Sequence, residues 1–176
     1  MGKRSDFAKI DKDKYNTPAA AVEPLFPYLP AGPVRYIEPC AGRGDLVRHL
    51  NADGLVCVYA SDIAPENLSS SPMRIVYRDA TTIAKAPLVI TNPPWTREVL
   101  HPIIRHFLEV CPAWYLFDAD WMHTRQASAL LLRCAVIVPV GRIKWIPDSE
   151  HTGKDNCCWY FFPTDHHTGP VVKPRI

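Results

Sequence analysis

Residues 34–54 read "VRYIEPCAGRGDLVRHLNADG" and contain the unit that decides the fold. The stretch 34–39 predicts a strand, and 45–54 predicts a helix that ends at a glycine. Between these elements, Gly42 and Gly44 allow the backbone to turn tightly and to approach a ligand closely. A strand, a glycine turn and a helix in this order predict an α/β fold with a ligand site at the strand end.

The rest of the chain continues the alternation of strands and helices, which predicts a doubly wound, mostly parallel sheet. The last two strands are joined by a loop too short for a helical crossover, so they should form an antiparallel C-terminal hairpin. Thr17 and Pro18 suit the N-cap and first turn of the first helix. We expect helices over 18–29, 45–54, 97–110 and 125–133, and seven strands over 34–39, 55–62, 74–80, 86–92, 113–119, 135–145 and 156–163.

The composition is that of an ordinary globular protein. The chain has 176 residues, 47% hydrophobic and 22% charged, which suits one domain with a complete core. We expect a flexible arm over 1–14, the domain over 15–163 and a tail over 164–176. The net charge of +2 is too small to argue for or against a polyanionic partner. Without a signal peptide or an apolar run of ~18 residues, we expect a cytoplasmic protein with no membrane partner.

The six cysteines predict neither a disulfide framework nor a metal site. No CxxC motif occurs, and most of the cysteines lie in apolar runs. We therefore expect reduced, buried side chains that behave as small hydrophobic residues. Cys157 and Cys158 are neighbours on an expected strand, so their side chains should point to opposite faces of the sheet.

Acidic residues stand at the ends of the first three expected strands, at Glu38, Asp62 and Asp79. Each acid alone is more often a helix cap or a solvated strand end. Because ligands of open α/β sheets bind beyond the carboxyl ends of the strands, three acids there indicate a cationic or hydroxyl-rich ligand. An amino-acid nucleoside, with its ammonium and ribose hydroxyls, fits this pattern. A pyrophosphate would be a poor neighbour for Glu38.

The fourth strand ends in "TNPPW" (91–95). Two prolines fix φ and donate no hydrogen bonds, so they hold Asn92 and the Pro93 carbonyl in a set geometry. Two acceptors that face one point can receive an exocyclic amine, and Trp95 offers a flat face to a planar ring. Positioning and electrostatics would then supply the catalysis without a general base. The alternative is a rigid strand-end turn with a core tryptophan.

Together these motifs resemble the S-adenosylmethionine-dependent amino-methyltransferases, mainly the adenine-N6 enzymes. The resemblance covers about residues 15–162 and implies a class I, Rossmann-like methyltransferase fold. The motif order matches one circularly ordered class of the family, in a compact form without a target-recognition domain, like phage or prophage enzymes. The motifs are "YNTP" (15–18, motif X), "EPCAGRGDL" (38–46, motif I), "SDI" (61–63, motif II), "RDA" (78–80, motif III) and "NPPW" (92–95, motif IV).

The resemblance implies that S-adenosylmethionine binds along the strand ends. Glu38 would hold its ammonium, directly or through water, Asp62 its ribose hydroxyls and Asp79 its adenine amino group. The remaining implied cofactor contacts are Tyr15, Thr17 and Pro18 at the methionine end, Ala41, Gly42 and Gly44 in the glycine turn, and Ile63 and Ala80 beside the adenine. The implied catalytic residues are Asn92, Pro93, Pro94 and Trp95.

The second half of the chain supplies candidate substrate contacts. Trp121 follows the fifth strand, and the expected hairpin loop over 141–156 has a local positive bias. Trp145 in this loop lies near where the family places an aromatic residue against the target base. A basic loop with an aromatic residue suits nucleic acid, whereas core packing of Trp121 and a solvated hairpin are the alternatives. The candidates are Trp121, Arg142, Lys144, Trp145 and Lys154.

The leading prediction is an adenine-N6 methyltransferase that acts on nucleic acid, with DNA favoured over RNA. A homo-oligomer or a specificity partner would supply target recognition. One alternative is a protein-glutamine methyltransferase, since a glutamine amide presents a similar –NH2. Another is a catalytically silent subunit that binds nucleic acid or a partner. An NAD-dependent oxidoreductase is disfavoured, because the third glycine of GxGxxG would fall at Val47.

Overall fold

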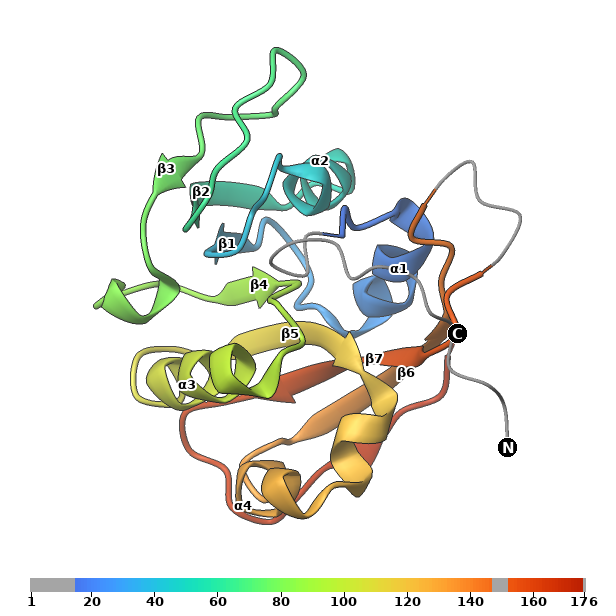
Figure 1. Cartoon of the computed structure of the whole chain (residues 1–176). Coiled ribbons are helices and arrows are strands. Elements are labelled where there is room, and N and C mark those ends of the chain that lie inside the picture. Colours follow the sequence, from blue (N-terminus) through green and yellow to red (C-terminus); the bar gives the residue numbers. More distant parts are fainter. Residues whose placement is uncertain (1–14, 147–151, 176) are drawn as a thin grey trace.

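The computed structural model describes residues 15–146 and 152–175, which form one mixed sheet with helices on both faces (Figure 1). The eight strands lie in the order β3-β2-β1-β4-β5-β7-β6-β8. Their bounds are β1 Arg35–Glu38, β2 Val56–Asp62, β3 Val76–Tyr77, β4 Val89–Thr91, β5 Ala113–Asp118, β6 Val136–Arg142, β7 Asn156–Phe162 and β8 Val171–Val172. The predicted flexible arm, residues 1–14, and part of the hairpin loop, residues 147–151, lie outside the described residues.

The strand directions confirm the predicted doubly wound α/β sheet. Strands β3, β2, β1, β4 and β5 run parallel to one another, and β7 pairs antiparallel with both β5 and β6. The predicted antiparallel hairpin is therefore present, with β7 next to the parallel strands and β6 beyond it. An eighth strand, β8, was not predicted. It pairs parallel with β6 from within the segment expected to be a tail.

The helices are shorter than the sequence periodicity indicated. Helix α3 (Arg97–Leu108) is the longest, and α2 (Asp45–Ala52) follows the glycine turn. Prolines at 24 and 27 leave the expected helix 18–29 as α1 (Ala19–Val22) followed by the 3-10 helix η2 (Glu23–Tyr28). The expected helix 125–133 is reduced to a 3-10 turn, η5 (Arg125–Ala127), and α4 (Ser128–Leu131). Two further 3-10 turns are η3 (Ala80–Thr82) and η4 (Ala119–His123).

Alternate residues of the central strands pack into two separate cores, one on each face of the sheet. On β5, Tyr115 and Phe117 belong to the core under α3, whereas Trp114 and Leu116 belong to the core under α1 and α2. This alternation follows from the two-residue period of a strand. As predicted, the side chains of Cys157 and Cys158 enter opposite cores. All six cysteines are free thiols.

No helix within 15–146 and 152–175 combines the length and apolarity needed to cross a membrane. The same residues contain no group of three or more His, Cys, Asp and Glu side chains that could hold a metal ion.

Candidate functional site

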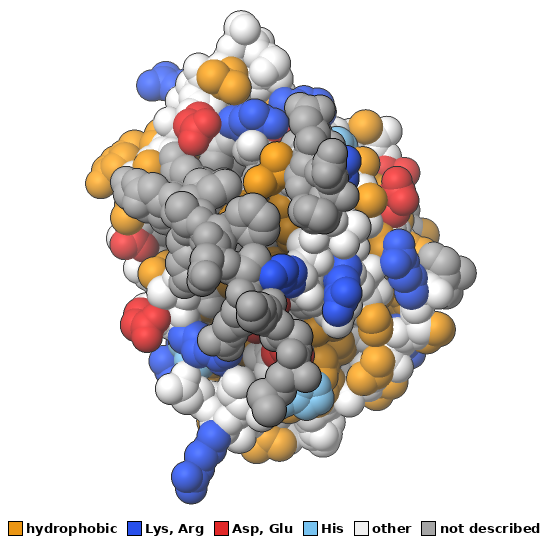
Figure 2. Space-filling model, turned by 45° about the vertical axis from the view of Figure 1, so that its right-hand side comes forward, with side chains coloured by type: hydrophobic (Ala, Val, Ile, Leu, Met, Phe, Trp, Pro, Cys, Tyr) orange, Lys and Arg blue, Asp and Glu red, His pale blue; other side chains and the backbone are white. Residues whose placement is uncertain are grey.

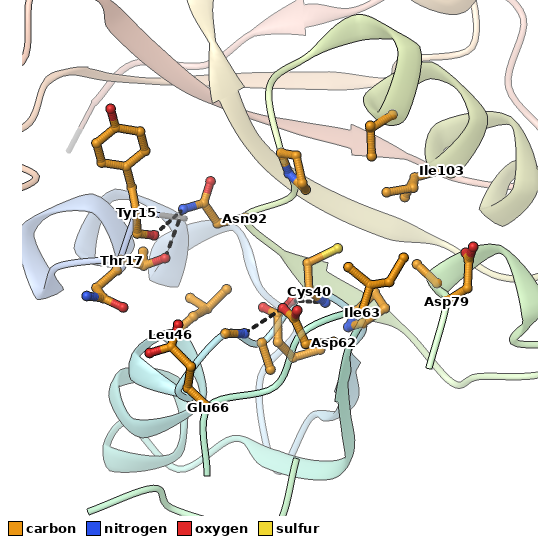
Figure 3. Close-up of a pocket in the computed structure, with 18 of the residues that line it drawn as sticks. Tyr15, Thr17, Cys40, Leu46, Asp62, Ile63, Glu66, Asp79, Asn92 and Ile103 are labelled. Carbon is orange, nitrogen blue, oxygen red and sulfur yellow. Dashed lines mark hydrogen bonds between the residues drawn. The ribbon is translucent and has the colours of Figure 1, made fainter. Parts of the chain in front are cut away.

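The winding of the chain reverses between β1 and β4, which are neighbours in the sheet although β2 and β3 intervene in sequence. Open α/β sheets bind ligands at such a switch point, beyond the carboxyl ends of the strands. A pocket of about 710 Å³ opens at this place. In Figure 3, Tyr15, Thr17 and Asn92 lie at one end of the pocket and Asp79 at the other, with Asp62 between them.

Glu38 is a fully buried carboxylate at the pocket wall, at the end of β1. Its Oε1 accepts hydrogen bonds from the Cys40 backbone N–H at 2.9 Å and from the Thr91 hydroxyl at the end of β4. Its Oε2 has no hydrogen-bond partner within the described residues. Burial raises the pKa of Glu38 to about 8, although the bonds from Thr91 and Cys40 act in the opposite direction. A buried carboxylate oxygen without a partner is the feature expected of a site for a cation.

The glycine turn is bonded to the end of β2. The Gly42 N–H donates to Asp62 Oδ2 at 2.8 Å, and Asp62 Oδ1 accepts from the Ala64 N–H at 2.7 Å. Gly42 has φ +54° and lines the pocket. Gly44, with φ +92°, is the N-cap of α2 and lies outside the pocket, where a Cβ would approach Pro72 Cδ to 2.8 Å. Asp62 thus fixes the turn that forms the pocket floor.

The charged side chains that line the pocket are all acidic. They are Glu38, Asp45, Asp62, Glu66, Asp79 and Glu98, and among residues 15–146 and 152–175 no Lys, Arg or His lines the pocket. Asp79 also acts as the N-cap of η3, because its Oδ1 accepts from the Thr81 N–H at 2.8 Å. Asp79 is therefore both the cap of η3 and a carboxylate that follows β3 and lines the pocket. The charge of the lining suits a cationic ligand and opposes a pyrophosphate.

Asn92 follows β4, and its amide is held at both ends. Its Nδ2 donates to Thr17 Oγ1 at 3.1 Å and, more weakly, to the Tyr15 carbonyl at 3.5 Å. Its Oδ1 accepts from the Trp95 indole N–H at 3.2 Å. The sequence had suggested Thr17 as the N-cap of the first helix. Its hydroxyl instead binds Asn92 and does not cap α1. Pro18 occupies the N-cap position of that helix, with no side-chain cap. This network fixes which end of the amide is the oxygen.

Three aromatic rings gather beside Asn92. Trp145 contacts Trp95 edge-on, with ring centroids 5.6 Å apart, and lies 6.2 Å from Tyr15. Gly153 packs against Trp145. The Gly153 N–H donates to the Ile143 carbonyl, and a Cβ added to Gly153 would lie 2.9 Å from Trp145 Cδ1. Residues from the N-terminal segment, the NPPW turn and the hairpin loop thus meet at one end of the pocket.

Most of the predicted cofactor and catalytic residues line the pocket together. They are Tyr15, Thr17, Glu38, Ala41, Gly42, Asp62, Ile63, Asp79, Ala80, Asn92 and Pro94. Four others lie beside it without lining it: Pro18, Gly44, Pro93 and Trp95. The individual roles that the resemblance implied for these residues remain predictions.

The predicted substrate residues are less well grouped. Trp121 is only 1% exposed, its ring packs edge-on against Phe117 and Tyr160, and it cannot contact a substrate from there. The prediction for Trp121 is therefore wrong, because η4 turns its ring into the core. Arg142, Lys144 and Lys154 are exposed and line no part of the pocket.

Sequence reasoning missed one wall of the pocket. Helix α3 contributes Glu98, Val99, Pro102 and Ile103, although the stretch 97–110 was interpreted only from its apolar spacing. Its position directly after the NPPW turn is the signal that could have placed its first turns at the site. The other pocket residues that were not predicted as site residues are Asn16, Pro39, Cys40, Asp45, Leu46, Glu66 and Thr81.

No known family and no curated protein matches the sequence, so the comparison rests on solved structures. A proposed RNA methyltransferase of Pyrococcus horikoshii superposes with a TM-score of 0.63 at 17% identity, over 90% of each chain. A proposed class I S-adenosylmethionine-dependent methyltransferase of Listeria monocytogenes gives 0.55 at 13%, over 89% of this chain and 62% of that one. A dimethyladenosine transferase of Plasmodium falciparum gives 0.54 at 13%, over 85% and 62%.

At these identities the likeness concerns the fold. The sheet order and the antiparallel hairpin are those of the class I S-adenosylmethionine-dependent methyltransferases, and the chain has this fold. The chain spans about three fifths of the length of the Listeria and Plasmodium proteins.

Proposed function

We propose that the protein is an S-adenosylmethionine-dependent methyltransferase that methylates the N6 amine of adenine in nucleic acid, with DNA favoured over RNA. The observation that carries this proposal is the pocket itself. The described residues that line it include six acidic side chains and no cationic one, and the pocket ends at an asparagine amide that Thr17 and Trp95 hold by hydrogen bonds.

The pocket residues fit the cofactor in charge and shape. S-adenosylmethionine carries an ammonium and a sulfonium, and the partnerless Oε2 of Glu38 is a buried acceptor for a positive group. Asp62, at the end of the neighbouring strand, would receive ribose hydroxyls. Ile63 lines the pocket with 57% of its surface exposed, which leaves an apolar face for a purine ring. An NAD pyrophosphate would find no cation among the described residues of this lining.

The chemistry that the cofactor supplies is an electrophilic methyl group on sulfur. The protein's part is to hold the acceptor amine in line with that group. Trp95 and Thr17 orient the Asn92 amide, and the oxygen of an amide has a second lone pair for an incoming N–H. An amine N–H that donates to this oxygen is polarised so that electron density shifts onto its nitrogen, which favours attack by the nitrogen lone pair on the methyl group.

The aromatic cluster supports a base as the acceptor. Tyr15, Trp95 and Trp145 lie beside Asn92 and offer ring faces for stacking. A base in a duplex would have to leave the stack to reach them, at a cost of a few kcal/mol. The Plasmodium protein of the same fold acts, by its name, on adenosine, which favours adenine as the target.

The test is methyl transfer from labelled S-adenosylmethionine to four pools: duplex DNA, single-stranded DNA, structured RNA and a cell protein extract. Each nucleic-acid pool is then digested to nucleosides. We expect N6-methyldeoxyadenosine from a DNA pool. Label in the protein pool alone would contradict the proposal and favour the protein-glutamine alternative. Cofactor binding without label in any pool would favour the silent-subunit alternative.

A further inference from the structure

Helix α3 carries a second hollow on its outer side. This basic groove has a volume of about 440 Å³ and is lined by Arg97, Glu98, His101, Pro102, Arg105 and Gln126. Arg97, His101 and Arg105 are spaced four residues apart and therefore share one helix face, where Arg105 is exposed, Arg97 is half-buried and His101 is only 7% exposed. Glu98 and Pro102 line both the groove and the pocket, which makes the two hollows neighbours.

The groove and the pocket differ in the sign of their charge. Among the residues that the structure describes, the pocket lining contains no cation, whereas the groove lining contains two arginines and one carboxylate, Glu98. Arg97 Nη1 donates to Thr124 Oγ1 at 3.0 Å, which holds one guanidinium in place. Arg105 is exposed to solvent. The protein therefore has a surface suited to an anion directly beside a pocket suited to a cation.

His101 supplies the groove with a neutral hydrogen-bond donor. Its Nε2 accepts from the buried Trp121 indole N–H at 2.9 Å, which leaves the ring proton on Nδ1. Burial lowers the pKa of His101, and the charges of Arg105 and Arg97 lower it further. Trp121, which the sequence suggested as a substrate contact, instead sets the tautomer of a groove residue from within the core.

On the face of the molecule that Figure 2 shows, the Lys and Arg side chains of the described residues lie among acidic and apolar ones. With a net charge of only +2, affinity for a polyanion depends on local clusters. Arginine guanidinium groups match phosphate oxygens in geometry and charge.

We propose that the basic groove on α3 binds the phosphodiester backbone of the substrate strand next to the target base. The inference rests on the proposed function and names the surface that holds its substrate. Arg97 and Arg105 would pair with phosphates, and His101 would donate a hydrogen bond to a backbone oxygen. Glu98 lines both hollows, and its carboxylate would favour the cationic cofactor over a phosphate.

The test is the affinity of the full chain for a fluorescent single-stranded adenine-containing oligodeoxynucleotide, measured by anisotropy from low to high salt. The main variant is Arg105→Gln, because the Arg105 guanidinium makes no hydrogen bond to any residue that the structure describes and its side chain is exposed. A second variant, R97Q/R105Q, removes both guanidinium groups. The matched control is Arg35→Gln, because Arg35 is exposed at the amino end of β1, away from the strand ends that form the site.

We expect Arg105→Gln to weaken binding about threefold to tenfold and to lower the slope of log Kd against log salt by about 0.7, as loss of one phosphate contact predicts for a single strand. The double variant should lose about twice that slope, and Arg35→Gln should behave as the wild type. Cofactor affinity should stay unchanged in all three. Wild-type affinity and slope in the double variant would overturn the groove proposal.

The two proposals can fail separately. Methylated nucleoside produced by a double variant that binds the oligonucleotide as the wild type does would overturn the groove and leave the proposed function standing. Loss of oligonucleotide affinity in the arginine variants, with no methyl transfer by the wild type to any nucleic acid, would support the groove and contradict the proposed function.

Discussion

At the residue scale, the site depends on polar side chains that burial and hydrogen bonds hold in one position. Glu38 is the clearest case, because a buried carboxylate with one partnerless oxygen costs free energy unless a ligand compensates it. Its raised pKa also has a consequence for stability. Between pH 4.5 and 8 the folded state binds more protons than the unfolded state, so the free energy of unfolding should fall as pH rises through this window.

The pKa of about 8 predicts a pH dependence of cofactor binding. A bound ammonium favours the ionised carboxylate, so binding should release the Glu38 proton and the Kd for S-adenosylmethionine should fall as pH rises from 6 to 8. Calorimetry on the wild type and on Glu38→Gln measures this. The ligand's own α-amino group, with a pKa of about 7.7–8.0, affects both proteins equally. Parallel pH profiles for the two proteins would contradict the role of Glu38.

Trp95 provides a second prediction at the residue scale. Trp95→Phe keeps a flat ring but removes the N–H that donates to Asn92 Oδ1. Loss of one neutral hydrogen bond, worth about 1 kcal/mol, should lower kcat about fivefold and leave the Kd for the cofactor unchanged. Steady-state kinetics with a saturating oligonucleotide measures both constants. A wild-type kcat would mean that Trp95 acts through its ring face alone.

At the element scale, the glycine turn between β1 and α2 is the structure that most of the site depends on. Gly44→Ala would place a Cβ 2.8 Å from Pro72 Cδ at a residue with φ +92°. The matched control is Gly54→Ala, since Gly54 has φ +89° with no atom within 4 Å of the added Cβ. Both variants share the backbone strain of ~1 kcal/mol or more, and only Gly44→Ala adds a clash.

We therefore expect Gly44→Ala to lower the free energy of unfolding by at least about 1 kcal/mol more than Gly54→Ala does. Urea denaturation followed by circular dichroism gives this difference. Equal losses in the two variants would mean that Pro72 moves aside and that the turn tolerates a side chain.

Helix α3 shows where prediction from the sequence ended. Its apolar spacing predicted the helix, and Ile104 and Phe107 are indeed buried in the core. The same spacing did not predict a function for the other face of the helix. Arg97 and Glu98 lie next to the groove and the pocket because α3 follows directly after NPPW (92–95). Trp121 failed for a related reason. Its strand-end position was read correctly, but the direction of its ring depends on η4, a turn with no sequence period.

At the scale of the whole molecule, the fold could be predicted because strand, glycine and helix signals agreed along the chain. The mostly parallel sheet and the antiparallel hairpin follow from alternation and loop length, whereas the insertion of β7 between β5 and β6 was not predicted. The grouping of Glu38, Asp62 and Asp79 around one pocket follows from parallel strands, whose ends share an edge. β8 could not be foreseen, because two valines in a polar segment give no periodic signal and their pairing depends on the exposed edge of β6.

The central claim is that one pocket binds the cofactor while Asn92 holds the amine that accepts the methyl group. The most direct test compares Asn92→Ala with Thr17→Val, measuring the Kd for S-adenosylmethionine and the rate of methyl transfer for each. Both variants break the Asn92–Thr17 hydrogen bond, but only Asn92→Ala removes the amide oxygen. We predict that Asn92→Ala loses transfer by about 100-fold or more, with a Kd within about threefold of that of Thr17→Val. Equal loss of transfer in both variants, or loss of cofactor binding in step with transfer, would contradict the account.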